Sequence, residues 1–257
     1  MQTKKGVIII IVLCLVLAIG TIAAINHSQK TTKIKPAATA AAGIILLELF
    51  TSEGCSSCPP ADELLKKIAL QYKENVIALS FHVDYWNRLG WKDPYSDASF
   101  SNRQRNYATA FGLEGVYTPQ IVVNGQKEMV GSDQKKLTKT IDDYLLEHAT
   151  GKISVTAESP DGKNITVNWQ EAYSASSQLH IALVQQNVST RVSRGENSGR
   201  TLIHYNVVRE FKTPAQQTNS LSFLMPAGLT KNEIAIVAFL QDTKSAKITA
   251  VKKCLLL

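Results

Sequence analysis

Hydrophobic positions in the first third of the chain follow two different periods. Short apolar runs at 44–50 and 76–83 are typical of strands that are buried on both faces, as in a parallel sheet. Between them, apolar side chains over 61–72 recur at the spacing of one helix face. A Pro-Pro pair at 59–60 fits only in a first helical turn, so we expect this helix to begin close to Cys55. The order strand–helix–strand predicts a right-handed crossover.

The next stretch, 84–117, is a long insert that holds eight of the 18 aromatic residues. Such an insert is typical of a satellite hydrophobic cluster, with a recognition surface as the alternative. The remaining elements of this region are expected as a helix at 97–111, strands at 118–123 and 127–130 joined by an Asn124-Gly125 turn, and a closing helix at 133–148.

From residue 151 the pattern changes to short apolar runs, several of which alternate with period two. Strands are expected at 153–157, 165–169, 179–184 and 234–239. We therefore predict two domains, an α/β domain at 44–150 and a small all-β sandwich at 151–257. The Arg- and Gly-rich segment 191–209 is interpreted as a solvated hairpin with local ion pairs, in preference to a loop that faces the first domain.

The N-terminus predicts export. Lys4 and Lys5 precede an apolar run at 6–25 that is long enough for one membrane-spanning helix. We expect residues 1–25 to be an inner-membrane signal anchor, with a cleaved signal peptide as the alternative, and 26–43 to be a flexible tether. Either arrangement places the body of the protein in the periplasm or another extracytoplasmic space.

Composition places the chain among globular proteins, with 44% hydrophobic and 19% charged residues. The formal charge of +7 is concentrated in the leader, because five of the 28 basic side chains and none of the 21 acidic ones lie in residues 1–35. The remaining balance of +2 gives no electrostatic footprint for a phosphate backbone, so no nucleic-acid partner is expected.

Four cysteines occur, and only Cys55 and Cys58 are close in sequence. Cys14 lies in the leader, and Cys254 is expected to be a buried thiol in a last strand. A C-x-x-C pair that follows a strand and opens a helix suits disulfide exchange, because the helix N-terminus stabilises a thiolate. Cys55 is then the nucleophile and Cys58 the resolving thiol. A static bridge and a metal clip remain alternatives.

In this context, residues 44–148 resemble the thioredoxin superfamily, through Cys55-Ser56-Ser57-Cys58, the ββα close and the Thr118-Pro119 step. The resemblance implies a thioredoxin-like βαβ–insert–ββα fold with a cis Thr118–Pro119 bond that faces the cysteines, where the backbone pairs with a substrate strand. More narrowly, the chain resembles a bacterial secreted family catalogued as domain of unknown function 1223. The motifs are 49–62, Phe81-His82-Val83-Asp84-Tyr85-Trp86, 90–94, 115–120, 194–202 and 206–209.

Other candidate site residues surround this pair. Glu48, seven residues before Cys55, is a candidate for the buried proton-relay acid that thioredoxins carry on this strand. His82 and Asp84 end the second strand, at the sheet edge where α/β sites gather. If the aromatic insert is functional, Trp86, Trp91 and Tyr95 would line a groove for an extended polypeptide.

The first functional hypothesis is an exported thiol–disulfide oxidoreductase that acts on exported protein substrates or a redox partner. Its catalytic residues would be Cys55, Cys58 and Pro119, and its only redox group the cysteine pair. The second is a copper metallochaperone in which Cys55, Cys58 and His82 hold the metal. The third is a non-catalytic module that binds a partner.

Overall fold

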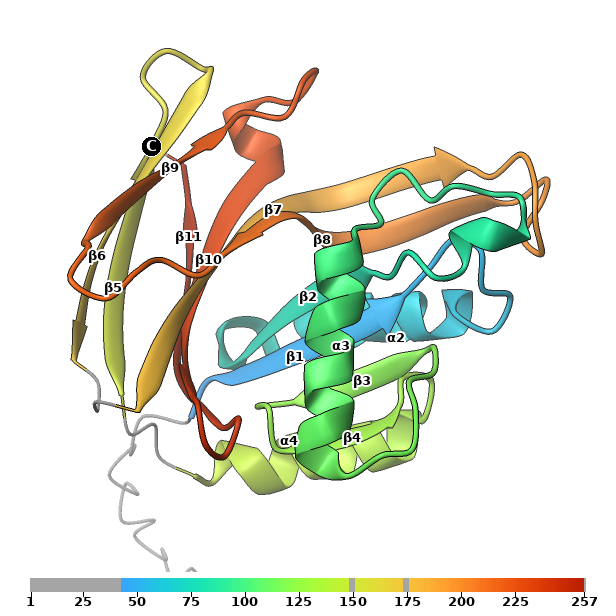
Figure 1. Ribbon diagram of the computed structural model, residues 1–257, viewed down its shortest axis with the longest axis horizontal. Coiled ribbons are helices and arrows are strands. Elements are labelled where there is room, and N and C mark those ends of the chain that lie inside the picture. The colour runs from blue at the N-terminus through green and yellow to red at the C-terminus, as the bar shows by residue number, and fades with distance from the viewer. Residues whose placement is uncertain (1–42, 148–150, 173–175, 257) are drawn as a thin grey trace, which may run out of the picture. The chain divides into compact units, whose positions relative to one another are not determined.

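An eight-stranded mixed sheet and a three-stranded sheet organise the residues that the computed structural model describes, which are 43–147, 151–172 and 176–256 (Figure 1). The expected leader and tether at 1–42 and the expected domain boundary at Thr150 lie outside the described residues. Within those residues, no helix is both long enough and apolar enough to cross a membrane.

The first region follows the predicted order of elements. β1 and β2 pair in parallel, β1 and β3 pair antiparallel, and β3 and β4 form a hairpin. Asp97 caps α3 by accepting a hydrogen bond from Ser99 N, and Asp133 caps α4 by accepting one from Lys136 N. The elements are β1 (Ile45–Thr51), α2 (Pro59–Tyr72), β2 (Val76–His82), α3 (Ala98–Phe111), β3 (Gln120–Val123), β4 (Lys127–Val130) and α4 (Gln134–Leu145).

Helix α2 begins later than the sequence predicted. The expected start was close to Cys55, but the first helical residues are Pro59 and Pro60, and Cys58 is the N-cap. Proline has no backbone N–H, so the pair occupies the positions where no intrahelical donor is needed. Cys55 therefore lies in a turn before the helix, with its carbonyl accepting from Cys58 N at 3.2 Å.

The second region consists of strands, and it contains more of them than the apolar pattern indicated. β8 and β9 were not predicted, because polar and charged residues interrupt their apolar positions. The strands are β5 (Lys152–Glu158), β6 (Asn164–Ala172), β7 (Ser177–Arg191), β8 (Thr201–Lys212), β9 (Ser220–Leu224), β10 (Ile234–Asp242) and β11 (Ile248–Leu255).

One sheet runs through both regions. Its strand order is β11-β10-β7-β8-β2-β1-β3-β4, and β8 pairs with β2 in parallel at Ser80 and Val207. Side chains reinforce this short pairing, since Ser80 Oγ donates to Tyr205 O at 2.9 Å and Asn206 Nδ2 donates to Ala78 O at 2.9 Å. The elements change from mixed helices and strands to strands near residue 150, but the large sheet contains strands from both sides of this point.

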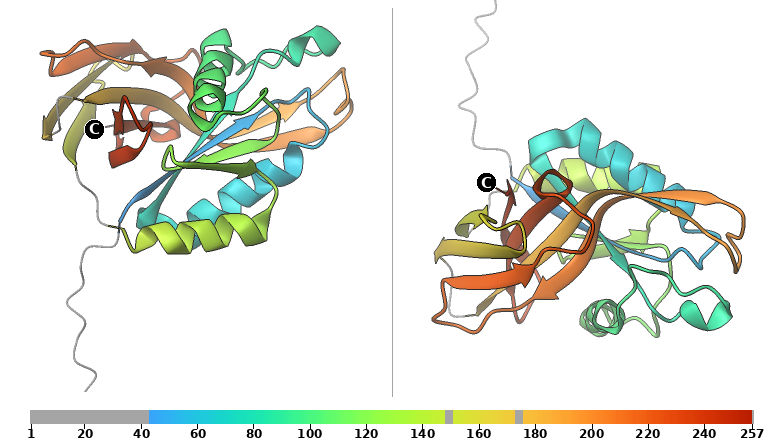
Figure 2. Two further views of the ribbon diagram at one scale, coloured as in Figure 1. Left: turned by 60° about the horizontal axis from the view of Figure 1, so that its bottom comes forward. Right: turned by 90° about the horizontal axis from the view of Figure 1, so that it is seen from above.

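Three hydrophobic clusters hold the layers together. α2 and α4 cover one face of the first-region strands, and α3 covers the other (Figure 2). The cluster under α3 joins the two regions, because Phe81 and Phe100 share it with Val208 and Phe239. A third cluster lies between the small sheet, β5-β6-β9, and the β7 and β10 strands of the large sheet.

The β3–β4 turn also touches the turn between β10 and β11, because Ile248 N donates to Asn124 O at 2.8 Å. At this contact Gly125 has a φ of +65°, and a β-carbon built on it would lie 2.0 Å from Ala246 O. Gly162 has a similar φ of +66° but open space around it. An alanine at Gly162 would carry only the cost of the left-handed backbone conformation. An alanine at Gly125 would carry the same cost and, in addition, a steric clash with Ala246.

We expect Gly162→Ala to lower the free energy of unfolding by about 1–2 kcal/mol, the usual cost of a left-handed alanine. Gly125→Ala should cost a further amount of about 1–3 kcal/mol, because its methyl group must displace the Ala246 backbone. Denaturant unfolding of both variants measures the difference. Equal destabilisation would show that this turn–turn contact is not tightly packed in solution.

Candidate functional site

Cys55 and Cys58 form a disulfide at the start of α2, with a Cα–Cα distance of 5.4 Å. Both cysteines are fully buried, whereas Ser56 and Ser57 between them are exposed. Ser57 Oγ lies 3.4 Å from Cys55 Sγ. The bridge therefore adjoins the positive end of a helix, the environment that stabilises a thiolate when such a bridge opens.

The tip of the β7–β8 hairpin covers this loop. Asn197 is fully buried, and its Nδ2 donates to both Glu53 O and Cys55 O at 2.9 Å. Glu196 Oε2 accepts a hydrogen bond from Ser56 N at 3.0 Å. The expectation that 191–209 is a solvated hairpin was wrong, because these side chains replace water as the partners of the C-x-x-C backbone.

A buried histidine–carboxylate cluster lies next to the bridge. It comprises Glu53, Asp62, His82, Asp93 and His204, all at most 3% exposed. His204 Nε2 is 3.3 Å from Glu53 Oε1, and its Nδ1 is 3.4 Å from Asp62 Oδ1. His82 Nδ1 is 2.7 Å from Asp93 Oδ2, and the two imidazole rings meet edge to face with centroids 4.6 Å apart.

Charge inside the cluster is set by these contacts. Burial disfavours a charged His204, but hydrogen bonds and charge from Asp62 and Glu53 outweigh burial and raise the pKa of His204 to about 10. Burial likewise opposes ionisation of Asp93, yet His82 and two backbone N–H groups lower the pKa of Asp93 below its usual value. His204, which lies between Glu53 and Asp62, is thus an imidazolium at neutral pH.

Asp62 connects the cluster to the resolving cysteine. It lies one helical turn after Cys58 on the same helix face, and its backbone N–H donates to Cys58 O at 3.2 Å. Its Oδ2 accepts a hydrogen bond from Thr51 Oγ1 at 3.0 Å, and its Oδ1 faces His204. The backbone of Asp62 thus contacts Cys58, while its carboxyl group contacts Thr51 and His204.

The Thr118–Pro119 bond is cis, as expected from the resemblance. Pro119 is buried and lies close to the first turn of α2. Gly131 is their common neighbour, since a β-carbon built on it would lie 3.3 Å from Pro119 Cβ and 3.1 Å from Ala61 Cβ. Trp86 Nε1 donates to Thr118 Oγ1 at 2.8 Å. This loop and the cysteine loop are thus neighbours.

The three aromatic residues predicted to line a groove are partly buried and hydrogen-bonded. Besides the Trp86 contact, Trp91 Nε1 donates to Glu53 Oε2 at 2.8 Å. The hydroxyl oxygens of Tyr95 and Thr190 are 3.1 Å apart. Trp91 and Tyr95 thereby tie the insert to the cysteine loop and to β7, and a substrate-binding role for them stays a prediction.

Two predicted residues lie elsewhere. Glu48 accepts a hydrogen bond from Arg103 Nη2 at 2.9 Å and another from Tyr107, because strand alternation turns it towards α3. Asp84 accepts a hydrogen bond from Ser101 Oγ in α3. Among the hydrogen bonds of the described residues, neither carboxylate is joined to the cysteine loop.

No preformed metal site occurs in the part of the chain that the structure describes. There, no three His, Cys, Asp or Glu side chains are placed to hold an ion. His82 is instead a hydrogen-bonded partner of Asp93. Cys254 is a half-buried free cysteine in β11, and burial raises the pKa of its thiol to about 11.

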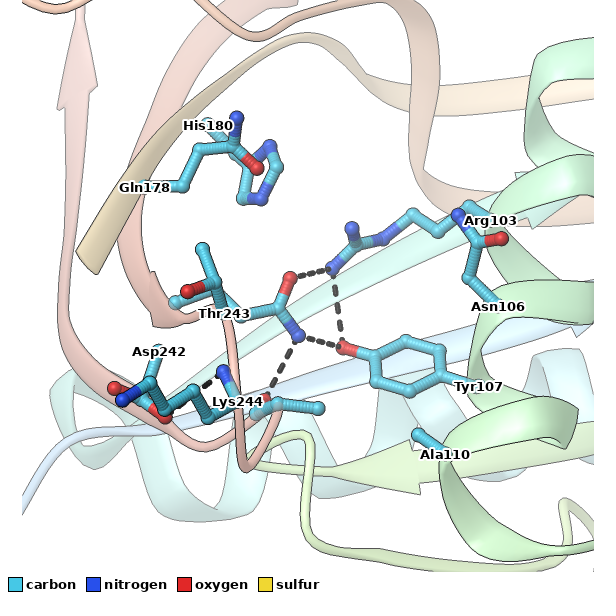
Figure 3. A pocket seen from close by; sticks show the side chains of 11 residues that line it. Arg103, Asn106, Tyr107, Ala110, Gln178, His180, Asp242, Thr243 and Lys244 are labelled. Atoms are coloured by element: carbon cyan, nitrogen blue, oxygen red, sulfur yellow. Dashed lines mark hydrogen bonds between the residues drawn. The ribbon is translucent and has the colours of Figure 1, made fainter. Parts of the chain in front are cut away.

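A cavity of about 250 Å³ lies away from the bridge, between α3 and the β10–β11 turn (Figure 3). Arg103 reaches into it and donates to Gln241 Oε1 at 3.3 Å. His180 also lines it, and burial together with the charge of Arg103 lowers the pKa of His180 to about 3. None of the cluster residues lines this cavity.

Sequence reasoning missed most of the polar residues around the bridge. The residues concerned are Glu53, Asp62, Asp93, Glu196, Asn197 and His204. The last three belong to the segment 191–209, for which a loop facing the first domain was only the less favoured alternative. Five of the six residues lie inside the motifs that carry the family resemblance, which was the available signal. His204 lies outside those motifs on a strand that the apolar pattern did not predict.

The raised pKa of His204 makes stability depend on pH. Its contribution is complete below about pH 6.5, where both states hold the proton, and is lost as pH rises through about 10. We expect the free energy of unfolding to fall over this range by a few kcal/mol, on the order of 3, and His204→Gln to remove most of that fall. Denaturant unfolding at several pH values measures it, and an unchanged slope in His204→Gln would contradict the assignment.

Comparisons with known proteins place this arrangement in a family. A search of curated proteins found no match. The crystal structure of protein AGR_C_4864 from Agrobacterium tumefaciens is similar, with a TM-score of 0.63 and 26% identity over 83% of this chain and 95% of that chain. A domain of the outer membrane lipoprotein Omp28 from Porphyromonas gingivalis matches with a TM-score of 0.27 and 14% identity over 42% of this chain and 88% of that one. The family model described as "Protein of unknown function (DUF1223)" matches residues 46–241, and the chain belongs to this family.

Proposed function

We propose that this protein is an exported thiol–disulfide oxidoreductase that acts on other exported proteins through Cys55 and Cys58. The observation that carries the proposal is the closed Cys55–Cys58 bridge at the start of α2, with the cis Thr118–Pro119 loop beside it. The βαβ and ββα order around it resembles a thioredoxin-like domain. Export rests on the apolar run at 6–25.

A purely structural role explains the bridge less well. Cys55 and Cys58 are three positions apart, so the bridge closes a very short loop. In the chain-entropy account, a disulfide stabilises least when its loop is short. The loop is also already held by Asn197 and by the α2 N-terminus. Disulfide exchange therefore accounts for a cysteine pair at this position better than stabilisation of the loop does.

The bridge oxidises a substrate dithiol in two balanced displacements. A substrate thiolate attacks Cys55 Sγ, forming a mixed disulfide, and Cys58 leaves as a thiolate that takes up a proton. The second substrate thiolate then attacks the substrate sulfur of the mixed disulfide and releases Cys55. Two electrons pass from the substrate to the cysteine pair, and the same steps in reverse reduce a substrate disulfide.

Asp62 is the residue of this chain best placed to handle the proton of Cys58. Both side chains are buried one helical turn apart, where water does not readily carry the proton. His204 and Thr51 hold the Asp62 carboxyl in place. In this assignment Asp62 is a positioning and proton-transfer residue, and the two cysteines are the catalytic residues.

In redox buffers, the pair of the full-length protein should titrate as one two-electron couple between about −120 and −270 mV. Alkylation and mass measurement follow the fraction reduced. Cys55→Ser should abolish exchange, because no sulfur remains for the substrate to join. Cys58→Ser leaves Cys55 as a free thiol, which should attack a supplied substrate disulfide and accumulate as a mixed disulfide with release of one substrate thiol. Cys254→Ser is the matched control with exchange retained.

Three other outcomes would contradict this function. A pair that stays oxidised below about −300 mV behaves as a structural disulfide. Reduced protein that binds copper through Cys55, Cys58 and His82 without exchanging disulfides would support the metallochaperone. Partner binding that survives Cys55→Ser, without any exchange, would support a non-catalytic module.

Asp62→Asn should slow exchange by about 100-fold at neutral pH, because a buried acid–base group is lost from the Cys58 step. Glu63→Gln, which changes the exposed neighbour on the same helix, is the matched control. The pH profile of the exchange rate should change in Asp62→Asn alone. An equal rate loss at every pH, with the profile unchanged, would assign Asp62 a structural role only.

A further inference from the structure

The hairpin tip places a carboxylate of this chain directly on the redox loop. Glu196 Oε2 accepts the N–H of Ser56, the residue that follows Cys55, at 3.0 Å. Glu196 is exposed, and its hydrogen bonds from Ser56 hold its pKa below the usual value. The loop N–H therefore has an acidic partner that lies 140 positions away in sequence and is open to competition from solvent.

Exposed basic residues are sequence neighbours of the points where the hairpin tip touches the insert. A β-carbon on Gly195 would lie 3.3 Å from Trp91 Cβ and 3.9 Å from Leu89 O, so the hairpin tip rests on the insert. The residues flanking these three contact points are Arg88, Lys92 and Arg194, which we call the basic rim. All three are exposed, and within the described part of the chain none forms an ion pair.

The hairpin tip is part of the cover over the cysteine loop. Cys55 and Cys58 are fully buried, and Asn197 lies over the carbonyl of Cys55. Moving the tip takes Glu196 off Ser56 N, which then needs another acceptor, because an unpaired backbone donor is costly. A carboxylate on an incoming chain restores this bond at a place where the basic rim already attracts negative charge.

We propose that the partner of this site is an extended polypeptide with acidic residues beside its cysteines, which displaces Glu196 from Ser56 and is held by the basic rim. This inference rests on the proposed oxidoreductase function and names its substrate class. Glu196 acts as an internal substitute for the substrate carboxylate. The hairpin keeps the bridge covered until an acidic chain replaces it, and a basic chain meets repulsion instead.

The test uses full-length oxidised protein and two synthetic dithiol peptides of equal length. One peptide carries glutamates beside its cysteines and the other carries lysines at those positions. Because flanking charge changes thiol reactivity by itself, each exchange rate is divided by the rate of the same peptide with 2-hydroxyethyl disulfide, which is uncharged. At low ionic strength the glutamate peptide should react about tenfold faster than the lysine peptide, and this preference should shrink in 0.5 M salt.

Two triple variants test whether the basic rim causes the preference for the glutamate peptide. The triple variant Arg88→Glu, Lys92→Glu, Arg194→Glu should lose the preference for the glutamate peptide. The triple variant Lys127→Glu, Lys135→Glu, Lys163→Glu changes net charge equally at exposed positions on β4, α4 and the β5–β6 turn, and should keep it. Glu196→Gln weakens the hairpin contact, so reduction by dithiothreitol should become several-fold faster.

The outcomes separate the two proposals. If dithiothreitol does not reduce the pair in any variant, the oxidoreductase function fails. If dithiothreitol reduces the wild-type pair but the two peptides react equally, or the lysine peptide reacts faster, the acidic-partner proposal is overturned and the function stands. Equal loss of preference in both triple variants would also overturn it, because net charge and not the basic rim would then be responsible.

Discussion

The pairing of β8 with β2 is the contact on which the rest of the arrangement depends. It is short, with Ser80 opposite Val207, and Ser80 and Asn206 extend it by donating to backbone carbonyls of the neighbouring strand. Once β8 lies beside β2, His204 is brought to the buried carboxylates and the β7–β8 hairpin reaches the cysteine loop. Without this strand, the first region would expose an edge of its sheet and leave Glu53 and Asp62 without their shared cation.

The buried histidine–carboxylate cluster makes the two regions electrostatically dependent on each other. Three carboxylates and two imidazoles are almost fully buried, and removal of one partner from such a network leaves an uncompensated charge in a low-dielectric interior. Glu53, Asp62 and Asp93 come from the first region, whereas His204 comes from the second. The cluster is thus assembled only when β8 has joined the sheet.

Burial of the bridge limits which thiols can react with it in the proposed chemistry. A cysteine pair that is open to solvent exchanges with any thiol of suitable potential, whereas here Asn197 and Glu196 occupy the backbone groups around the sulfurs. The family match over residues 46–241 spans both the cysteine pair and this hairpin. The hairpin and the disulfide therefore lie within the same family match.

The sequence by itself determined the local features of this protein. Period and turn chemistry located β1, α3 and the β3–β4 hairpin, and the C-x-x-C pair identified the candidate site. Only the tertiary structure decided which polar groups share the site. Glu48 turned away with the alternation of its strand, and His204 met Glu53 across 151 positions of sequence. Local patterns report the conformation of a segment, but the pairing of distant strands depends on side chains such as Ser80 and Asn206, which carry no periodic signal.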